Sequence, residues 1–252
     1  MRESRGNAVV EAAIVLPLWI LLLLCTVQLA LLGRARLLAE YAAYRAARAG
    51  ILWNGDPERM QRAAIHALRS TACPSRFPAA SPLCTAYALD GGTSALAALS
   101  SDAHLGFPGV HVYILSPHWP SHAHLFDVGA EELDFDRFDP EPERRDATLL
   151  TVQLQYWFEL KIPFADGILW RAFSALLAHD AREDEEIHRG RYVPLSARAR
   201  AAMQSAAADR RGYFVPVVAH ATLRMQSNFF ARFVRDCSCF EGSGCSADCR
   251  AW

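Results

Sequence analysis

The sequence predicts an α+β fold: a long N-terminal helix packs on an antiparallel sheet domain that has additional helices and a cysteine-rich tail. Three observations predict it. Residues 12–33 form a run of 22 residues without a charged side chain, two later segments alternate apolar and polar residues, and cysteines gather near the C-terminus. The chain has 252 residues, of which 52% are hydrophobic, and its net charge is −1. Composition therefore gives no bulk electrostatic case for nucleic-acid binding.

The apolar run predicts a single membrane anchor, because a hydrocarbon core needs about 20 residues of helix. Only Thr26 and Gln28 are clearly polar within it. A secretory signal fits less well, since its apolar core spans about 7–15 residues and no small-x-small cleavage site follows the run before Arg34. Good helix formers continue to Ala49, and Gly50 is the expected stop.

A helix from residue 7 to residue 50 would be roughly 65 Å long at 1.5 Å per residue. That is too long for the membrane alone, so its second half should project and pack against the soluble domain. Tyr41, Tyr44 and Arg48 share one face of this half. That face could meet neighbouring subunits or the protein's own sheet, and the sequence leaves both open.

Glu11 is the unusual residue near the start of the apolar run. A carboxylate at mid-bilayer costs about 2.5–3.5 kcal/mol, although one turn from a helix start the cost is lower and the helix dipole favours an acid. Glu11 is either a tolerated interfacial acid or a functional one. A cut after Gly6 would make Asn7 the new amino terminus, and Glu11 could then pair with an α-amine, its own or that of a neighbouring subunit.

The motif R-G-x-x-x-V-E-x-A-x-x-x-P carries a family resemblance. The residues are Arg5, Gly6, Val10, Glu11, Ala13 and Pro17. The segment resembles a class III type IV pilin-like signal and, more narrowly, the TadE-like proteins of the Tad (Flp) pilus machinery. Two positions depart from the family pattern: Ala12 stands where members often have Phe, and Asn7 is not the Phe or Met common in other type IV pilins.

This resemblance implies a minor pilin or pseudopilin, without enzymatic activity or cofactor, that is cut by a prepilin peptidase. The implied partners are other pilins or pseudopilins, the inner-membrane pilus assembly platform and membrane lipid, with no nucleic acid. The expected organisation is a cytoplasmic leader at residues 1–6, a transmembrane and projecting helix at 7–50, and a periplasmic α+β domain at 51–252. The resemblance covers residues 5–50 well, and the later strands and the segment 224–227 moderately.

Orientation in the bacterial inner membrane rests on conflicting signals. Counting Lys and Arg beside the span puts the C-terminal side in the cytoplasm. The resemblance requires the leader there instead, and the cysteines favour an oxidising compartment for the domain. Cys25 lies inside the span, where it is inert or at most a lipidation candidate. Six further cysteines are disulfide candidates: Cys73, Cys84, Cys237, Cys239, Cys245 and Cys249.

The spacing of these cysteines favours disulfides, and a structural zinc in the tail is the alternative. Cys73 and Cys84 bracket a proline-rich loop and are expected to pair. The tail set C-x-C-x5-C-x3-C could supply four thiolates to zinc, but it lacks the two C-x2-C knuckles typical of such sites. If the domain were cytoplasmic, zinc would be favoured.

The remaining elements follow from local patterns. Asp56-Pro57-Glu58 predicts a helix start, with the helix ending near residue 70. Residues 93–100 predict a short helix, residues 110–115 a strand, residues 116–147 irregular chain, and residues 167–211 charged helices. Period-two alternation predicts half-buried strands at residues 151–162 and 213–226, which should pair antiparallel. Pro216 indicates an edge strand or a bulge in the second.

Three clusters of side chains are candidates for chemical sites. The histidines at positions 118, 122 and 124 favour an exposed loop over a metal site, and the aspartates at 134, 136 and 139 favour a solvated loop over calcium, which needs six to eight oxygens. The run 182–189 reads as a solvated helix face. The sequence has no Gly-rich phosphate loop and no G-x-S-x-G. The rival hypothesis is a membrane-tethered periplasmic binding protein or metal-dependent enzyme, with the His loop or Cys tail carrying function.

Overall fold

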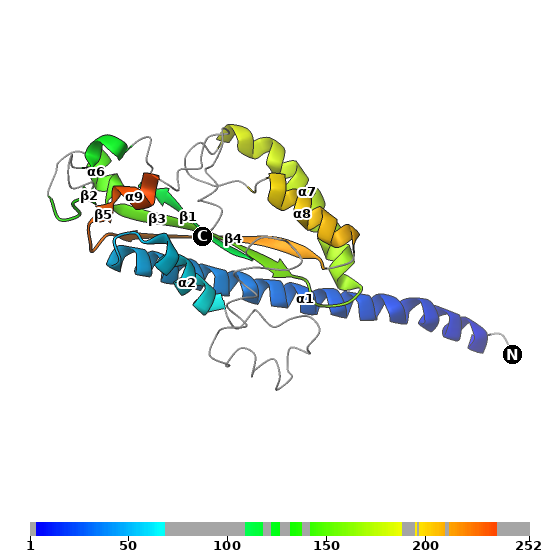
Figure 1. The fold of residues 1–252 in the computed structure, drawn as a ribbon. Coiled ribbons are helices and arrows are strands. Elements are labelled where there is room, and N and C mark those ends of the chain that lie inside the picture. Colours follow the sequence, from blue (N-terminus) through cyan, green and yellow to red (C-terminus); the bar gives the residue numbers. More distant parts are fainter. Residues whose placement is uncertain are drawn as a thin grey trace.

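A computed structural model describes residues 4–68, 109–117, 122–126, 132–137, 142–187, 195, 197–209 and 212–235, with side chains left out at residues 4–9, 123, 177–187, 197–199 and 234–235. Its centre is an antiparallel sheet in the order β1-β3-β4, formed by Val110–Ser116, Leu149–Glu159 and Phe214–Arg224. Helix α1, Ser4–Leu52, and helix α2, Pro57–Leu68, lie along one face. Helices α7, Ala165–Ile187, and α8, Ala197–Ala208, lie on the other side (Figure 1). The predicted α+β fold is confirmed.

Helix α1 continues past the expected stop at Gly50 and ends at Leu52. Gly50 lies inside the helix. A Cβ at this position would come within 2.4 Å of Leu150 and 2.9 Å of Met60. The helix ends instead in a left-handed turn, with Asn54 at φ 58° and Gly55 at φ 77°. The Gly55 amide donates to the Gly50 carbonyl at 2.9 Å, as in a Schellman motif. The close approach of neighbouring elements, rather than the cap, explains the glycine at position 50.

The second half of α1 packs on the sheet through alanines, as its length predicted. Fully or almost fully buried are Ala35, Ala39, Ala42, Ala43, Ala46 and Ala47. Alanine at these positions lets the helix backbone come close to the sheet, where the alanines join one core with Val152, Leu154 and Tyr156. Tyr41 and Tyr44 are exposed, so the tyrosine face points away from the protein's own sheet.

Strand β3 is central and covered on both faces, and the expectation of a half-buried strand is wrong. Its even-numbered residues face α1, as the alternation predicted. However, Gln153, Gln155 and Trp157 on the other face are also buried. Helix α8 covers part of that face, since Trp157 packs with Met203.

Strand β4 pairs with β3 along its whole length, from Leu149↔Arg224 to Glu159↔Phe214, and it is an edge strand that contains Pro216. Both predictions for this segment, antiparallel pairing and a strand position that tolerates proline, are therefore confirmed.

The shorter elements refine the remaining predictions. Helix α2 begins as expected, with Asp56 Oδ1 accepting from the Glu58 amide at 3.0 Å. The stretch 116–147 is not wholly irregular: it holds a 3-10 turn at Ala123–Leu125, strand β2 at Glu132–Leu133 and helix α6 at Pro142–Ala147. Strand β2 pairs with β5, Phe229–Phe230, which leads into α9, Ala231–Arg235. The loop expected at 71–84 and the helix expected at 93–100 lie outside the described residues.

We predict that Gly55→Ala destabilises the fold by about 2–4 kcal/mol. A Cβ at Gly55 would meet the buried ring of Phe229 at 2.3 Å, and the position has positive φ, so left-handed strain adds to overpacking. Thermal unfolding of the full chain in detergent measures this. Gly33→Ala is the matched control, because nothing lies within 4 Å of its added Cβ. Equal unfolding temperatures for the two variants would contradict the prediction.

Candidate functional site: the apolar helix and its junctions

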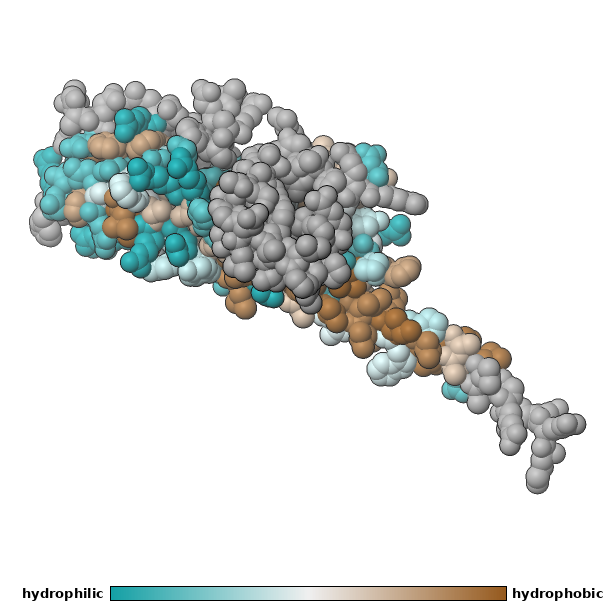
Figure 2. All heavy atoms as spheres, turned by 60° about the horizontal axis from the view of Figure 1, so that its bottom comes forward, coloured by the Kyte–Doolittle hydropathy of each residue, from teal (hydrophilic) through white to brown (hydrophobic). Residues whose placement is uncertain are grey.

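The first half of α1 stands free of the sheet domain. Its apolar side chains are exposed from Val10 to Leu29: Val10, Ile14, Val15, Leu16, Leu18, Trp19, Ile20, Leu22, Leu23, Val27 and Leu29. Figure 2 shows hydrophobic residues gathered along this free length, towards the N-terminus. By length and composition, α1 is the one helix in the described part of the chain that is suited to crossing a bilayer. An exposed apolar surface of this size indicates a membrane or a partner.

The predicted processing and assembly residues lie at the beginning of this free length. Gly6 and Asn7 are within the helical backbone of α1, and Glu11 is exposed. Within the residues that the structure describes, Glu11 has no hydrogen-bond or ion-pair partner. The cut after Gly6 and the pairing of Glu11 with an α-amine stay predictions.

Gln28 marks the point where the free length ends. Its side chain is 0% exposed, and its Oε1 accepts two backbone hydrogen bonds, from Lys161 N at 3.0 Å and from Ile162 N at 2.8 Å. One amide side chain of α1 thus satisfies two backbone N–H groups of the turn that follows β3. Unmade bonds of this kind cost about 1–3 kcal/mol each when buried. Gln28 therefore fixes where the sheet domain is attached along α1.

Sequence reasoning identified Gln28 only as a polar residue in an apolar run. Its partners lie 133 and 134 positions away, so no local pattern could identify them. The available signal was the cost of an amide in an apolar helix, the same argument that singled out Glu11.

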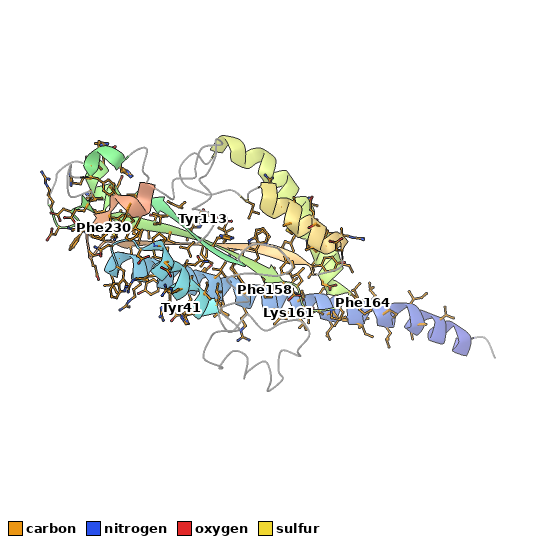
Figure 3. All side chains as sticks on the ribbon, in the orientation of Figure 1. Tyr41, Tyr113, Phe158, Lys161, Phe164 and Phe230 are labelled. Carbon is orange, nitrogen blue, oxygen red and sulfur yellow. The ribbon has the colours of Figure 1, made fainter. Side chains whose placement is uncertain are left out.

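Two residues of the turn held by Gln28, Lys161 and Phe164, have unusual environments. Lys161 is largely buried, and burial lowers the pKa of its ammonium, while the charge of Glu159 acts in the opposite direction. Phe164 is 77% exposed and adopts φ 70°, a backbone region that is unfavourable for a bulky residue. Figure 3 places Phe164 beyond Lys161, towards the free end of α1.

A second junction holds the C-terminal end of α1. Ser227 Oγ donates to the Ile51 carbonyl at 2.9 Å and accepts from the Asn54 amide at 3.0 Å. Asn54 Nδ2 donates to the Asn228 carbonyl at 2.7 Å. The segment after β4 therefore caps the last turn of α1, which satisfies groups that a helix end leaves open. At 1.5 Å per residue, about 36 Å of helix separates this junction from Gln28.

An apolar groove lies beside the Gln28 junction, between α1, α7 and β4, and has a volume of about 450 Å³. Its lining is Leu29, Leu32, Gly33, Arg36, Phe173, Leu176, Val215, Pro216, Val217 and Val218. The lining is apolar except for Arg36, whose Nε lies 3.5 Å from Glu40 Oε1. Leu176 is 60% exposed, so the apolar surface of α1 continues onto α7.

Most of the other predicted site residues lie outside the part of the chain that the structure describes. All six cysteines outside the span lie beyond the described residues, as do His118 and Asp139. Cys25 has a free thiol. His124 Nε2 lies 3.6 Å from a Glu143 carboxylate oxygen. The described part of the chain has no group of three His, Cys, Asp or Glu side chains arranged to hold a metal ion.

Asp134 and Asp136, two of the three aspartates expected in a solvated loop, interact with each other. Asp134 Oδ1 accepts from the Asp136 amide at 3.2 Å. Their side chains also hydrogen-bond, which lowers the pKa of Asp134 and raises that of Asp136. Of the charged run 182–189, the structure describes only the backbone of the α7 part.

Comparison with protein families gives one match, to the free and projecting helix. The family model described as TadE-like protein matches residues 6–48. The matched residues begin at Gly6, include Glu11 and Gln28, and end four residues before α1 does. The match is confined to this helix and does not extend into the sheet domain. Comparisons with curated proteins and with solved structures gave no match to the chain.

We predict that Gln28→Leu loosens the turn after β3. Leucine has a similar size but leaves the amides of Lys161 and Ile162 without their acceptor, at a cost of about 1–3 kcal/mol. Hydrogen exchange at these two amides should become about tenfold faster or more. Thr26→Val is the control, because the Thr26 hydroxyl bonds only to Leu22 within its own helix. Unchanged exchange in Gln28→Leu would show that the junction does not depend on this side chain.

Proposed function

We propose that the protein is a pilin-like structural and assembly subunit of a Tad (Flp) type IV pilus or a related secretion apparatus. The observation that carries the proposal is that the TadE-like match at residues 6–48 coincides with the helix whose first half is apolar and exposed. The helix anchors the subunit in the inner membrane before assembly. The leader lies in the cytoplasm, the sheet domain lies in the periplasm, and a prepilin peptidase cuts after Gly6.

The mechanism of such a subunit is packing rather than catalysis, and we propose no enzymatic activity. The free length of α1 docks among the apolar helices of other pilins or pseudopilins. Glu11 is then positioned to meet an α-amine, either the new terminus at Asn7 or that of a neighbour. Charge pairing at that depth is favourable because each charge alone is costly in hydrocarbon.

The two junctions support this mechanism. They hold α1 against the sheet at Gln28 and at Asn54, and the buried alanines fill the length between. A force or displacement applied to the free helix is therefore carried to the sheet domain as a rigid body. The exposed Tyr41 and Tyr44 give a second surface for neighbouring subunits, because they do not pack on the protein's own sheet.

The rival function, a tethered binding protein or metal-dependent enzyme, rests on the cysteines and on the histidine loop. Most of those residues lie outside the described part of the chain, and no specific observation favours that function. Stoichiometric zinc in the purified protein would favour it.

The experiment that tests the proposal is the mass of the mature N-terminus of protein isolated from membranes. We expect a chain that begins at Asn7 when the prepilin peptidase is present and at Met1 when it is absent. An intact Met1 in both strains would contradict processing and leave only a tethered domain. A cut near residues 33–36 would indicate a secretory signal and would contradict the anchor as well.

We predict that Glu11→Ala abolishes incorporation into pili without disturbing the fold, because Glu11 is exposed on the free length of α1. The measurement is the amount of the protein in the sheared pilus fraction, with the unfolding temperature as the check on folding. Glu40→Ala is the matched control, since Glu40 is an exposed acid of the same helix beyond the apolar length and pairs with Arg36. Wild-type incorporation of Glu11→Ala would disprove the role of this carboxylate.

A further inference from the structure

The free length of α1 is shorter than a bilayer is thick. If the hydrocarbon begins after Glu11, the helix reaches Gln28, its first fully buried residue, after about 24 Å at 1.5 Å per residue. A hydrocarbon core is about 30 Å thick and takes about 20 residues of helix. The hydrocarbon would then extend to about Leu31. The turn that Gln28 holds therefore sits at the depth of the membrane boundary, not above it.

The residues of that turn match this depth. Phe164 is among the most exposed large apolar side chains of the described residues, at 77%, and Figure 3 shows it on the side of the domain nearest the free end of α1. Ile168, one turn further along α7, is also exposed. An exposed aromatic side chain is typical of the interface between hydrocarbon and headgroups.

Neither the backbone nor the core of the protein explains a phenylalanine at this position. The φ of 70° at Phe164 favours glycine or asparagine, and a bulky residue there is strained by about 1–2 kcal/mol. The ring gains little burial within the protein in exchange, because it is mostly exposed. A contact outside the chain would give the ring the burial that the fold does not.

The surroundings indicate that this contact is lipid. One groove beside the free length of α1 is lined by Leu29 and Leu32 of α1 and by the exposed Leu176 of α7. Exposed Arg34 and Arg36 follow directly beyond the expected hydrocarbon boundary, where their guanidinium groups can meet lipid phosphates. This groove beside the membrane helix, together with the short free length of that helix, favours a bilayer over a protein partner.

We propose that the β3–α7 turn, with Phe164 and Ile168, is seated in the outer boundary of the bilayer and forms a second membrane contact beside α1. The inference rests on the proposed membrane anchoring of α1. With Gln28 fixing the turn on the helix, the contact sets the depth and the tilt of the sheet domain relative to the membrane.

The test is photo-crosslinking of the full-length protein in lipid nanodiscs of phosphatidylethanolamine and phosphatidylglycerol. p-Benzoylphenylalanine replaces one aromatic residue at a time: Phe164, Trp19 as the control within the span, and Trp53 as the control at the far end of α1. All three side chains are exposed, at 77%, 67% and 51%. We expect lipid adducts at positions 164 and 19 and none at position 53.

Each other outcome is decisive. Lipid adducts at position 19 without any at 164 would overturn the seated turn and leave the anchor intact. A protein adduct at 164 in place of lipid would show a protein occupant and overturn the inference. The absence of lipid adducts at position 19 would contradict the anchoring on which the inference rests.

Bilayer thickness gives an independent readout. In thinner bilayers of dilauroyl lipids, the free length of α1 matches the hydrocarbon, so adducts at position 164 should decline while those at 19 persist. Adducts at 164 that do not change with thickness would contradict a contact set by helix length.

Discussion

The rest of the structure depends on the close approach of α1 to the sheet. The alanines of its second half are buried almost completely, and their small volume brings the helix backbone near β3 and β4. Larger side chains would separate the helix from the sheet and leave voids that are costly in a packed core. Both polar junctions require this approach, because the Gln28 and Asn54 side chains reach backbone groups of the sheet domain directly. The alanine stripe therefore determines where the domain sits along the helix.

One helix thus has two environments, and the boundary between them lies at Gln28. Before it, most apolar side chains of α1 are exposed, although Leu21, Leu24 and Cys25 are half-buried. After it, one face is covered by the sheet while Tyr41 and Arg45 lie on the exposed face. Pro17, inside the free half, does not interrupt α1. Because the helix is continuous across the boundary, its apolar first half and the folded domain cannot reorient independently without breaking helical hydrogen bonds or the Gln28 junction.

Much of this arrangement follows from sequence patterns, and the exceptions have physical reasons. Period-two alternation predicted the β3–β4 pair and the face of β3 that meets α1, because strand geometry is local. This alternation could not predict that Gln153 and Trp157 on the opposite face of β3 are buried. Part of that face is covered by α8, which begins about 40 residues later in the chain. Gly50 was misassigned as a helix stop because its role depends on contact with Met60 and Leu150. The resemblance at Gly6 and Glu11 was readable from sequence, whereas the Gln28 partners were not.

Glu11 and Gln28 are two polar residues of one apolar helix, and they differ in their hydrogen-bond partners. The Oε1 of Gln28 accepts hydrogen bonds from two backbone amides of its own chain, whereas its buried Nε2 has no hydrogen-bond partner among the described residues. Glu11 lies on the free length, and the described residues offer it no partner. In the proposed membrane-anchored subunit, water or headgroups meet this carboxylate at the membrane boundary, and a group that arises from processing or assembly replaces them. A charge that is tolerated at the boundary and costly deeper in hydrocarbon can distinguish the two locations. In the proposed pilin-like subunit, this carboxylate favours release from the bilayer only when the new amine of a pilin is there to pair with it.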